Sequence, residues 1–272
     1  MTKKLLTFGC SYTDESYITA TMNDPVLKET LLDNDGEYTK SFPFWPTLLA
    51  EHLDIKLENH ASLGIGNDII GSIFTDVMFH KPKDVGLVVI MWSEFMRIGF
   101  EQYLKTGIIS TKKDWFKINI TAGAKNDQYR KKQLEVQEVL NKNSLISMDA
   151  MLNRSLRIFY NAQSVLENLN IPYRMVMGMP PCRGEYENKF CKSLLKSQYS
   201  EMFNPEVFLG WPMWKPLDGF SCASKLYDMG EENFINMGNV HPSEIGQKNI
   251  TDLIITGYNY PRLRKAIYDT NH

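Results

Sequence analysis

The chain has 272 residues, of which 43% are hydrophobic and 23% charged, and its formal net charge is −2. This is the composition of an ordinary globular protein, long enough to bury a core without disulfides or metals. A net charge so close to zero gives no general attraction to nucleic acid or to an anionic membrane, so we expect neither as a partner. No apolar run approaches the roughly 18 residues of a membrane span, and the run near the N-terminus is too short for a signal peptide.

The cysteines and histidines narrow the chemistry further. Cys10, Cys182, Cys191 and Cys222 show no C-x-x-C spacing, which predicts free thiols in a reducing compartment. The five histidines form no metal-ligand pattern, so we expect no catalytic metal. Together with the absent leader, this favours a cytoplasmic location.

Apolar runs and helical spacing alternate along the first part of the chain. They predict, in order, a strand over 5–8, a helix over 44–53, a strand over 55–58, a helix over 67–79 and a strand over 85–91. The run Leu87-Val88-Val89-Ile90 is the clearest strand, because continuous apolar sequence is typical of a central parallel strand covered on both faces. Residues 14–42 are polar and irregular, and we expect them to form an insertion above the sheet.

The second part of the chain begins with another polar stretch. Residues 101–145 are rich in Lys and Asn and lack a sustained period, which predicts an insertion or lid, partly helical near 130–140, rather than a sheet element. Apolar patterns then predict a helix over 149–169, a strand over 173–177, a helix near 187–202 and a helix over 243–257 capped by Ser243. Strands alternating with helices indicate a parallel sheet with helices on both faces, in one domain over 1–272.

In such a sheet, functional groups gather in the loops beyond the carboxyl ends of the strands. Four loops carry the polar residues that matter. They are Gly9 to Thr13, Asn59 to Asn67, Trp92 to Arg97, and Asn239 to Ser243.

Three of these loops resemble sequence blocks of the SGNH (GDSL-type) hydrolases. Phe8-Gly9-Cys10-Ser11-Tyr12-Thr13 resembles the first block, F-G-D-S-x-T, and Asn59 to Gly64 resembles the second, N-x-x-x-x-G. His241-Pro242-Ser243, followed by Gly246, resembles the fifth. With its G-C-S first block, the chain is similar to phage-type members of this superfamily.

The resemblance implies a fold and a set of roles. The fold is three-layer α/β/α with a flavodoxin-like parallel sheet. Ser11 would be the nucleophile and His241 the base, while the N–H groups of Ser11 and Gly64 would hold the oxyanion.

Three departures from the family pattern bear on activity. Cys10 replaces the usual aspartate before the nucleophile. The third block, G-x-N-D, is here Met91-Trp92-Ser93-Glu94, so its Asn donor is missing and either Ser93 or Asn67 would have to serve. Asn239 stands two residues before His241, where many members carry the catalytic aspartate, and an amide cannot carry charge.

These departures predict weak activity. In serine proteases, changing the acid to Asn lowers kcat by about 10⁴, and losing an oxyanion donor lowers it by about 10²–10³. We therefore expect any hydrolysis to be slow and to rise in an Asn239→Asp variant.

Other residues near these loops have two interpretations each. Trp92 belongs either to the core or to a surface that stacks on a sugar. Arg97 either pairs with Glu94 or binds a substrate carboxylate or phosphate. Cys10 is a small buried residue or, as a minor alternative, the nucleophile itself.

Two functions from different classes follow. The first is a serine ester hydrolase that acts on O-acyl groups, acetyl among them, of a carbohydrate or small ester, without a cofactor. The alternative is a catalytically weakened scaffold that serves as a binding or structural, virion-associated protein.

Overall fold

The computed structural model describes residues 3–25, 27–33, 36–104, 112–119, 128–182 and 184–256. Its centre is a five-stranded parallel sheet in the order β2-β1-β3-β6-β7. The strands are β1 (Lys4–Phe8), β2 (Lys56–Asn59), β3 (Val85–Trp92), β6 (Tyr173–Met177) and β7 (Phe208–Leu209). Counted along the sheet alone this is the order 2-1-3-4-5 of flavodoxin-like folds, in which ligands bind where the strand order reverses, here between β1 and β3.

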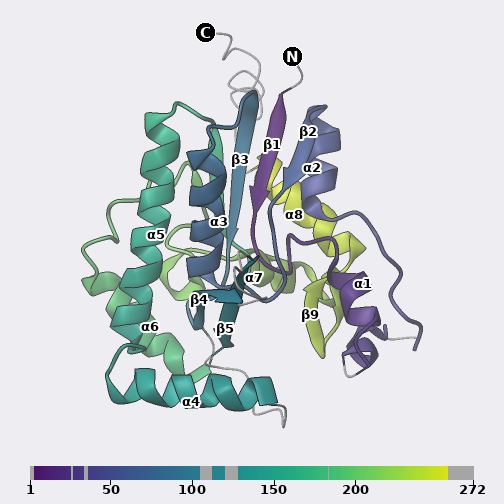
Figure 1. Cartoon of the computed structure of the whole chain (residues 1–272). Helices are drawn as coiled ribbons and strands as arrows, with labels where there is room; N and C mark the ends of the chain where they lie inside the picture. The colour runs from purple at the N-terminus through teal and green to yellow at the C-terminus, as the bar shows by residue number, and fades with distance from the viewer. Residues whose placement is uncertain are drawn as a thin grey trace.

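Helices cover both faces of the sheet, which confirms the predicted three-layer α/β/α class (Figure 1). One face carries α3 (Asn67–Phe79), α5 (Met148–Asn168) and α6 (Glu187–Lys196). The other carries α2 (Trp45–Leu53), α7 (Cys222–Met229) and α8 (Glu244–Thr256).

The apolar run of β3 shows why the sheet lies between two cores. Its side chains alternate in direction, so Val88 and Ile90 pack with α3 and α5, whereas Leu87 and Val89 pack with α2 and α8. All four are fully buried. The helices and strands predicted for this sheet agree with the structure to within a few residues, except that α6 ends at Lys196 and β7 was not predicted.

Smaller elements cluster at the carboxyl end of the sheet (Figure 1). The short helix α1 (Tyr17–Met22) and the antiparallel pair β8 (Phe234–Asn236) and β9 (Asn239–Pro242) lie on one side. Strands β4 (Arg97–Leu104) and β5 (Lys112–Asn119), with helix α4 (Gln128–Lys142), lie on the other. Single 3₁₀ turns complete the described chain at Lys28–Leu31, Gly184–Tyr186, Lys215–Leu217 and Glu231–Asn233.

The β4–β5 hairpin corrects one prediction. Residues 101–145 were expected to hold no strand, yet β4 and β5 form a two-stranded sheet of their own, separate from the central one. The predicted helix near 130–140 is present as α4. The hairpin is held because Ile98 and Ile118, which face each other across it, pack on Met151 of α5.

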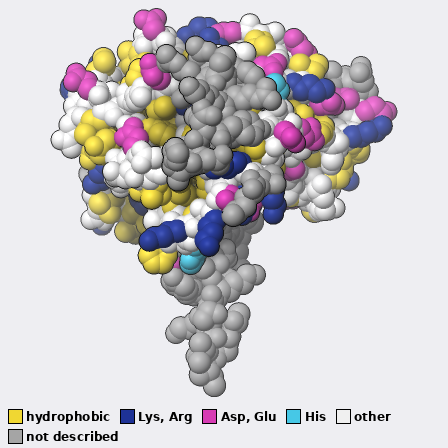
Figure 2. Space-filling view, turned by 90° about the horizontal axis from the view of Figure 1, so that it is seen from above, with side chains coloured by type: hydrophobic (Ala, Val, Ile, Leu, Met, Phe, Trp, Pro, Cys, Tyr) yellow, Lys and Arg dark blue, Asp and Glu magenta, His cyan; other side chains and the backbone are white. Residues whose placement is uncertain are grey.

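The surface carries charges of both signs. In Figure 2, lysine, arginine and acidic side chains are interspersed over the visible described surface. None of the helices in the described ranges combines the length and the apolar character needed to cross a membrane.

Candidate active site

Ser11 lies in a tight turn directly after β1. The turn is closed by the N–H groups of Thr13 and Asp14, which both donate to the Cys10 carbonyl at 2.9 and 3.0 Å. Gly9 leaves room for this turn, since a Cβ there would lie 2.2 Å from the Thr13 hydroxyl oxygen. Cys10 is fully buried in the core, and the side chain presented at the sheet edge is that of Ser11.

The turn brings Ser11 to His241, which lies 230 positions away along the chain. Ser11 Oγ and His241 Nε2 are 2.8 Å apart, within the range for general-base contact. The predicted proximity of these two side chains is confirmed, and the minor alternative of Cys10 at this position is not supported. Tyr12 holds the Ser11 turn next to the segment that carries His241, because its hydroxyl donates to the Val240 carbonyl.

Asn239 contacts the other nitrogen of the imidazole ring. Its Oδ1 lies 2.7 Å from His241 Nδ1, so Ser11, His241 and Asn239 form a continuous relay. Asn239 is 5% exposed, and its own N–H donates to the side chain of Asn236. The amide of Asn239 therefore makes the contact to His241 Nδ1 that a catalytic carboxylate would make.

The orientation of that amide determines the tautomer of His241. Asn239 Nδ2 lies 2.8 Å from the Thr30 carbonyl oxygen, which can only accept, so this atom must be the NH₂ group. The backbone N–H of His241 points to Oδ1 at 3.3 Å and fixes the same orientation. With Oδ1 facing the ring, Nδ1 carries the proton and Nε2 is the acceptor for the Ser11 hydroxyl. The sequence leaves open whether the amide selects the unproductive tautomer, and these contacts select the productive one.

Tyr17 is a member of this site that was not predicted from the sequence. Its ring stacks on His241 with centroids 3.9 Å apart and planes 16° from parallel. Its hydroxyl lies 3.1 Å from Asn239 Oδ1 and 3.0 Å from Nδ2. Both Tyr17 and Thr30 belong to the polar segment 14–42, whose sequence carries no motif that marks them.

Gly64 occupies the loop after β2. It is exposed and has φ +69°, a left-handed conformation that favours glycine. Asn59 ties this loop to the nucleophile turn, since its Nδ2 donates to the Thr13 carbonyl at 2.8 Å. Within the described residues, no acceptor lies on the N–H groups of Ser11 or Gly64, so both can donate to an incoming oxygen.

The side chain of Asn67 is bonded to the backbone of Ser93. The backbone N–H of Ser93 donates to Asn67 Oδ1 at 2.8 Å, and Asn67 Nδ2 donates to the Ser93 carbonyl at 2.9 Å and to Ser155 Oγ at 3.2 Å. Asn67 is 1% exposed, and both hydrogens of its amide are used. The expectation that Asn67 replaces the missing oxyanion donor is therefore not supported by its contacts. The buried Ser93 hydroxyl has no hydrogen-bond partner among the described residues, so Ser93 stays a candidate donor.

Trp92 is a core residue. It is fully buried and stacks on Phe159 of α5 with centroids 4.3 Å apart. The alternative of a sugar-stacking surface is wrong, because no face of the ring reaches solvent.

Arg97 forms the predicted ion pair with Glu94. The distance from Arg97 Nε to Glu94 Oε1 is 2.7 Å, and their side chains are 12% and 3% exposed. Arg97 also lies against the loop that carries Gly64, since a Cβ on Gly66 would come within 2.5 Å of its carbonyl oxygen. Its Nη2 reaches Met179 Sδ beyond β6. The guanidinium is thus a buried cation at the edge of the sheet.

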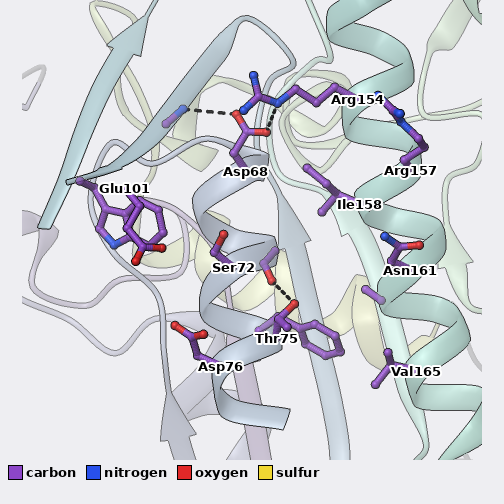
Figure 3. Close-up of a pocket in the computed structure, with 15 residues that line it drawn as sticks. Asp68, Ser72, Thr75, Asp76, Glu101, Arg154, Arg157, Ile158, Asn161 and Val165 are labelled. Atoms are coloured by element: carbon purple, nitrogen blue, oxygen red, sulfur yellow. Dashed lines mark hydrogen bonds and ion pairs between the residues drawn. The ribbon is translucent and has the colours of Figure 1, made fainter. Parts of the chain in front are cut away.

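A separate cavity of about 620 Å³ lies between α3, α5 and the β4–β5 hairpin (Figure 3). Asp68 bridges its walls, because its carboxylate pairs with Arg154 at 2.6 Å and accepts from the Gly99 N–H at 3.3 Å. Burial raises the pKa of Asp68, although Arg154 opposes the shift. Neither Ser11 nor His241 lines this cavity. The ion pair joins α3 to α5, and the Gly99 hydrogen bond ties the hairpin to α3.

Metal ligation and thiol chemistry find little support in the geometry. In the described part of the chain, no three His, Cys, Asp or Glu side chains are grouped so that they could hold a metal ion. Burial raises the pKa of Cys182 and of Cys222 to about 12, which keeps both as neutral thiols.

The chain resembles known proteins in structure and not in sequence. No family model matches the chain, and no curated protein matches it in sequence. A similar solved structure is that of a protein assigned to the G-D-S-L family of lipolytic proteins, from Desulfitobacterium hafniense DCB-2. The two chains are 13% identical with a TM-score of 0.44, over 94% of this chain and 99% of that one. Because a likeness at this level carries no functional argument, we base the function on the geometry of the site.

Proposed function

We propose that this chain is a serine ester hydrolase that removes O-acyl groups, acetyl among them, from a carbohydrate or another small ester. The observation that carries the proposal is the relay of Ser11, His241 and Asn239, with contacts of 2.8 and 2.7 Å. A nucleophile bonded to a base, which is itself oriented by a third group, is the arrangement that activates a serine.

In the proposed first step, Ser11 Oγ attacks the acyl carbonyl carbon while its proton passes to His241 Nε2. The carbonyl oxygen becomes an oxyanion, which accepts hydrogen bonds from the N–H groups of Ser11 and Gly64. When this intermediate collapses, the ester C–O bond breaks and His241 returns the proton to the leaving alcohol oxygen. An acyl group then remains on Ser11.

In the second step, water attacks the acyl-enzyme with His241 again as the base. The acid product leaves and Ser11 recovers its proton.

The test uses p-nitrophenyl acetate and acetylated oligosaccharides, with release of nitrophenol or acetate as the readout. We expect slow turnover that falls to the spontaneous rate in Ser11→Ala and His241→Ala variants, whose folding is checked by thermal unfolding. A wild-type rate equal to that of Ser11→Ala on every ester would contradict the proposal.

One observation favours the second candidate, a weakened scaffold with a binding or virion-associated structural role. The hydrogens of the Asn67 amide are used by the Ser93 carbonyl and Ser155, so Asn67 provides no side-chain oxyanion donor. A fluorophosphonate probe separates the two candidates. A scaffold with a residual site would be labelled at Ser11 without turning over any ester, whereas the proposed hydrolase would do both. A cytoplasmic location, with a virion-associated one as alternative, stays a prediction.

A further inference from the structure

Tyr17 contacts both the base of the relay and the group that orients it. The ring lies flat on the imidazole of His241, 3.9 Å between centroids, and the hydroxyl lies 3.1 Å from the Asn239 amide oxygen. The residue after it, Ile18, anchors this position, because it packs in a small buried cluster with Leu31. Tyr17 is thus held against the relay by the segment that also supplies the Thr30 carbonyl.

We propose that Tyr17 is a positioning residue that takes over part of the role of the carboxylate missing at position 239. Its ring stabilises the imidazolium that forms when Ser11 loses its proton, and its hydroxyl holds the Asn239 amide. The inference rests on the proposed hydrolase function. The physical basis is the negative face of an aromatic ring, which attracts a cation within about 6 Å of its centroid. A neutral amide cannot supply this attraction, whereas the ring can.

The surroundings of His241 support this role. The titratable side chains whose rings face it are Tyr17, stacked, and Tyr12, edge-on with centroids 5.4 Å apart. The two carboxylates that precede Tyr17, Asp14 and Glu15, each accept from backbone N–H groups at 3.0 and 3.2 Å. Burial raises the pKa of Tyr17, so its phenol stays neutral and the ring keeps its π face over the working pH range.

The experiment measures the pKa and tautomer of His241 directly, by NMR of ¹⁵N-labelled histidine, beside the pH profile of kcat/KM. Tyr17→Phe keeps the ring and removes the hydroxyl, so the pKa of His241 should change little. Tyr17→Leu removes the ring, and the pKa of His241 should fall by about 0.4–1.5 units, the range that a cation–π contact implies. The acidic limb of kcat/KM should move down by the same amount, and kcat on its plateau should fall.

Two further variants make the test decisive. Tyr38→Leu is the matched control, since Tyr38 lies in the same segment but bonds to Glu29, and it should leave the pKa of His241 unchanged. If Tyr17→Leu does not fold, pentafluorophenylalanine at position 17 keeps the shape while removing the negative face, and should lower the pKa likewise.

An unchanged or raised pKa of His241 in both ring-altering variants would overturn the inference. This outcome is distinct from failure of the proposed function. A wild type that cleaves no ester sinks the hydrolase proposal whatever the NMR shows, whereas an active wild type without a pKa shift sinks only the role of Tyr17.

Discussion

Replacing Asn239 by aspartate tests the relay most directly, and the contacts of Asn239 lead us to predict the opposite of the gain in activity expected from sequence. Asn239 Nδ2 donates to the Thr30 carbonyl at 2.8 Å, at a site only 5% exposed. In Asn239→Asp, a carboxylate oxygen would face that carbonyl oxygen at the same distance. The new charge would be buried beside an acceptor, and a lost partner for a buried polar group costs about 1–3 kcal/mol.

The variant can relieve this contact only by keeping a proton. Either the introduced carboxyl group stays protonated and donates to the Thr30 carbonyl, or His241 becomes the imidazolium and pairs with the carboxylate. An opposite charge this close raises a pKa by about 1–3 units, so a smaller fraction of His241 would be unprotonated and able to accept from Ser11 at neutral pH. We therefore expect kcat/KM at pH 7 to fall, with its acidic limb moved to higher pH.

The stability of the Asn239→Asp variant should depend on pH with a definite sign. The folded-state pKa of His241 would lie above its unfolded value of about 6.5, so the ion pair contributes fully below that pH and is lost as pH rises through the folded pKa. At pH 9 the loss should reach about 1–3 kcal/mol, or roughly 2–12 °C in Tm for a domain of this size. The measurements are thermal unfolding from pH 5 to 9 and kcat/KM over the same range.

Asn236→Asp is the matched control for this change. Asn236 Nδ2 donates to the same Thr30 carbonyl at 3.0 Å, but its second acceptor is the Leu32 carbonyl, whereas the Asn239 amide turns its oxygen to the His241 ring. The control should lose stability in a similar way without moving the acidic limb. Our assignment of the amide orientation is refuted if Asn239→Asp is as stable as wild type and gains kcat with an unmoved pH profile.

Two other substitutions follow from buried groups. Arg97→Met should destabilise the fold by about 3–5 kcal/mol in denaturant unfolding, because it removes the cation that pairs with the Glu94 carboxylate, which is 3% exposed. Adding Glu94→Gln should recover most of this loss of stability. A milder effect of Arg97→Met alone would show that the ion pair is solvated. His60 stacks on Phe8, and burial lowers its pKa, so the unfolded state binds the extra proton below about pH 6.5 and stability falls as pH drops through that window. His60→Phe should flatten this part of the stability curve between pH 7 and 5, and an unchanged slope would contradict the assignment.

The central strand β3 was predictable because it is apolar on both faces. Val85 to Trp92 carries no polar side chain, and only a strand between two helical layers satisfies such a run. The β4–β5 hairpin was missed for a physical reason too. Ile98, Phe100, Phe116 and Ile118 do alternate with polar residues, but their apolar face covers a helix instead of the main core, so the signal is confined to short stretches among lysines.

The site was predictable only in part. Ser11, Gly64 and His241 stand in recognisable blocks, whereas the contacts of Thr30 and Tyr17 depend on how the segment 14–42 folds back. Any residue type can provide a backbone carbonyl that orients an amide, so no sequence pattern marks the residue that does so. Asn67 and Trp92 show the opposite error, because the sequence assigned them to the site although they contact the residues behind it. Asn67 bonds to the Ser93 backbone, and Trp92 stacks on Phe159.

These contacts also bear on how much activity a neutral third member allows. In serine proteases, the loss of about 10⁴ on changing the acid to Asn arises because the amide selects the wrong tautomer of the histidine. Here the Thr30 carbonyl and the backbone N–H of His241 turn the amide oxygen of Asn239 toward the His241 ring, which favours the productive tautomer. The part of the kcat loss that comes from the wrong tautomer should therefore not apply. What remains is the missing charge opposite the imidazolium, which the face of Tyr17 partly offsets. The geometry is one in which hydrogen bonds and ring stacking orient His241 without a charged third group.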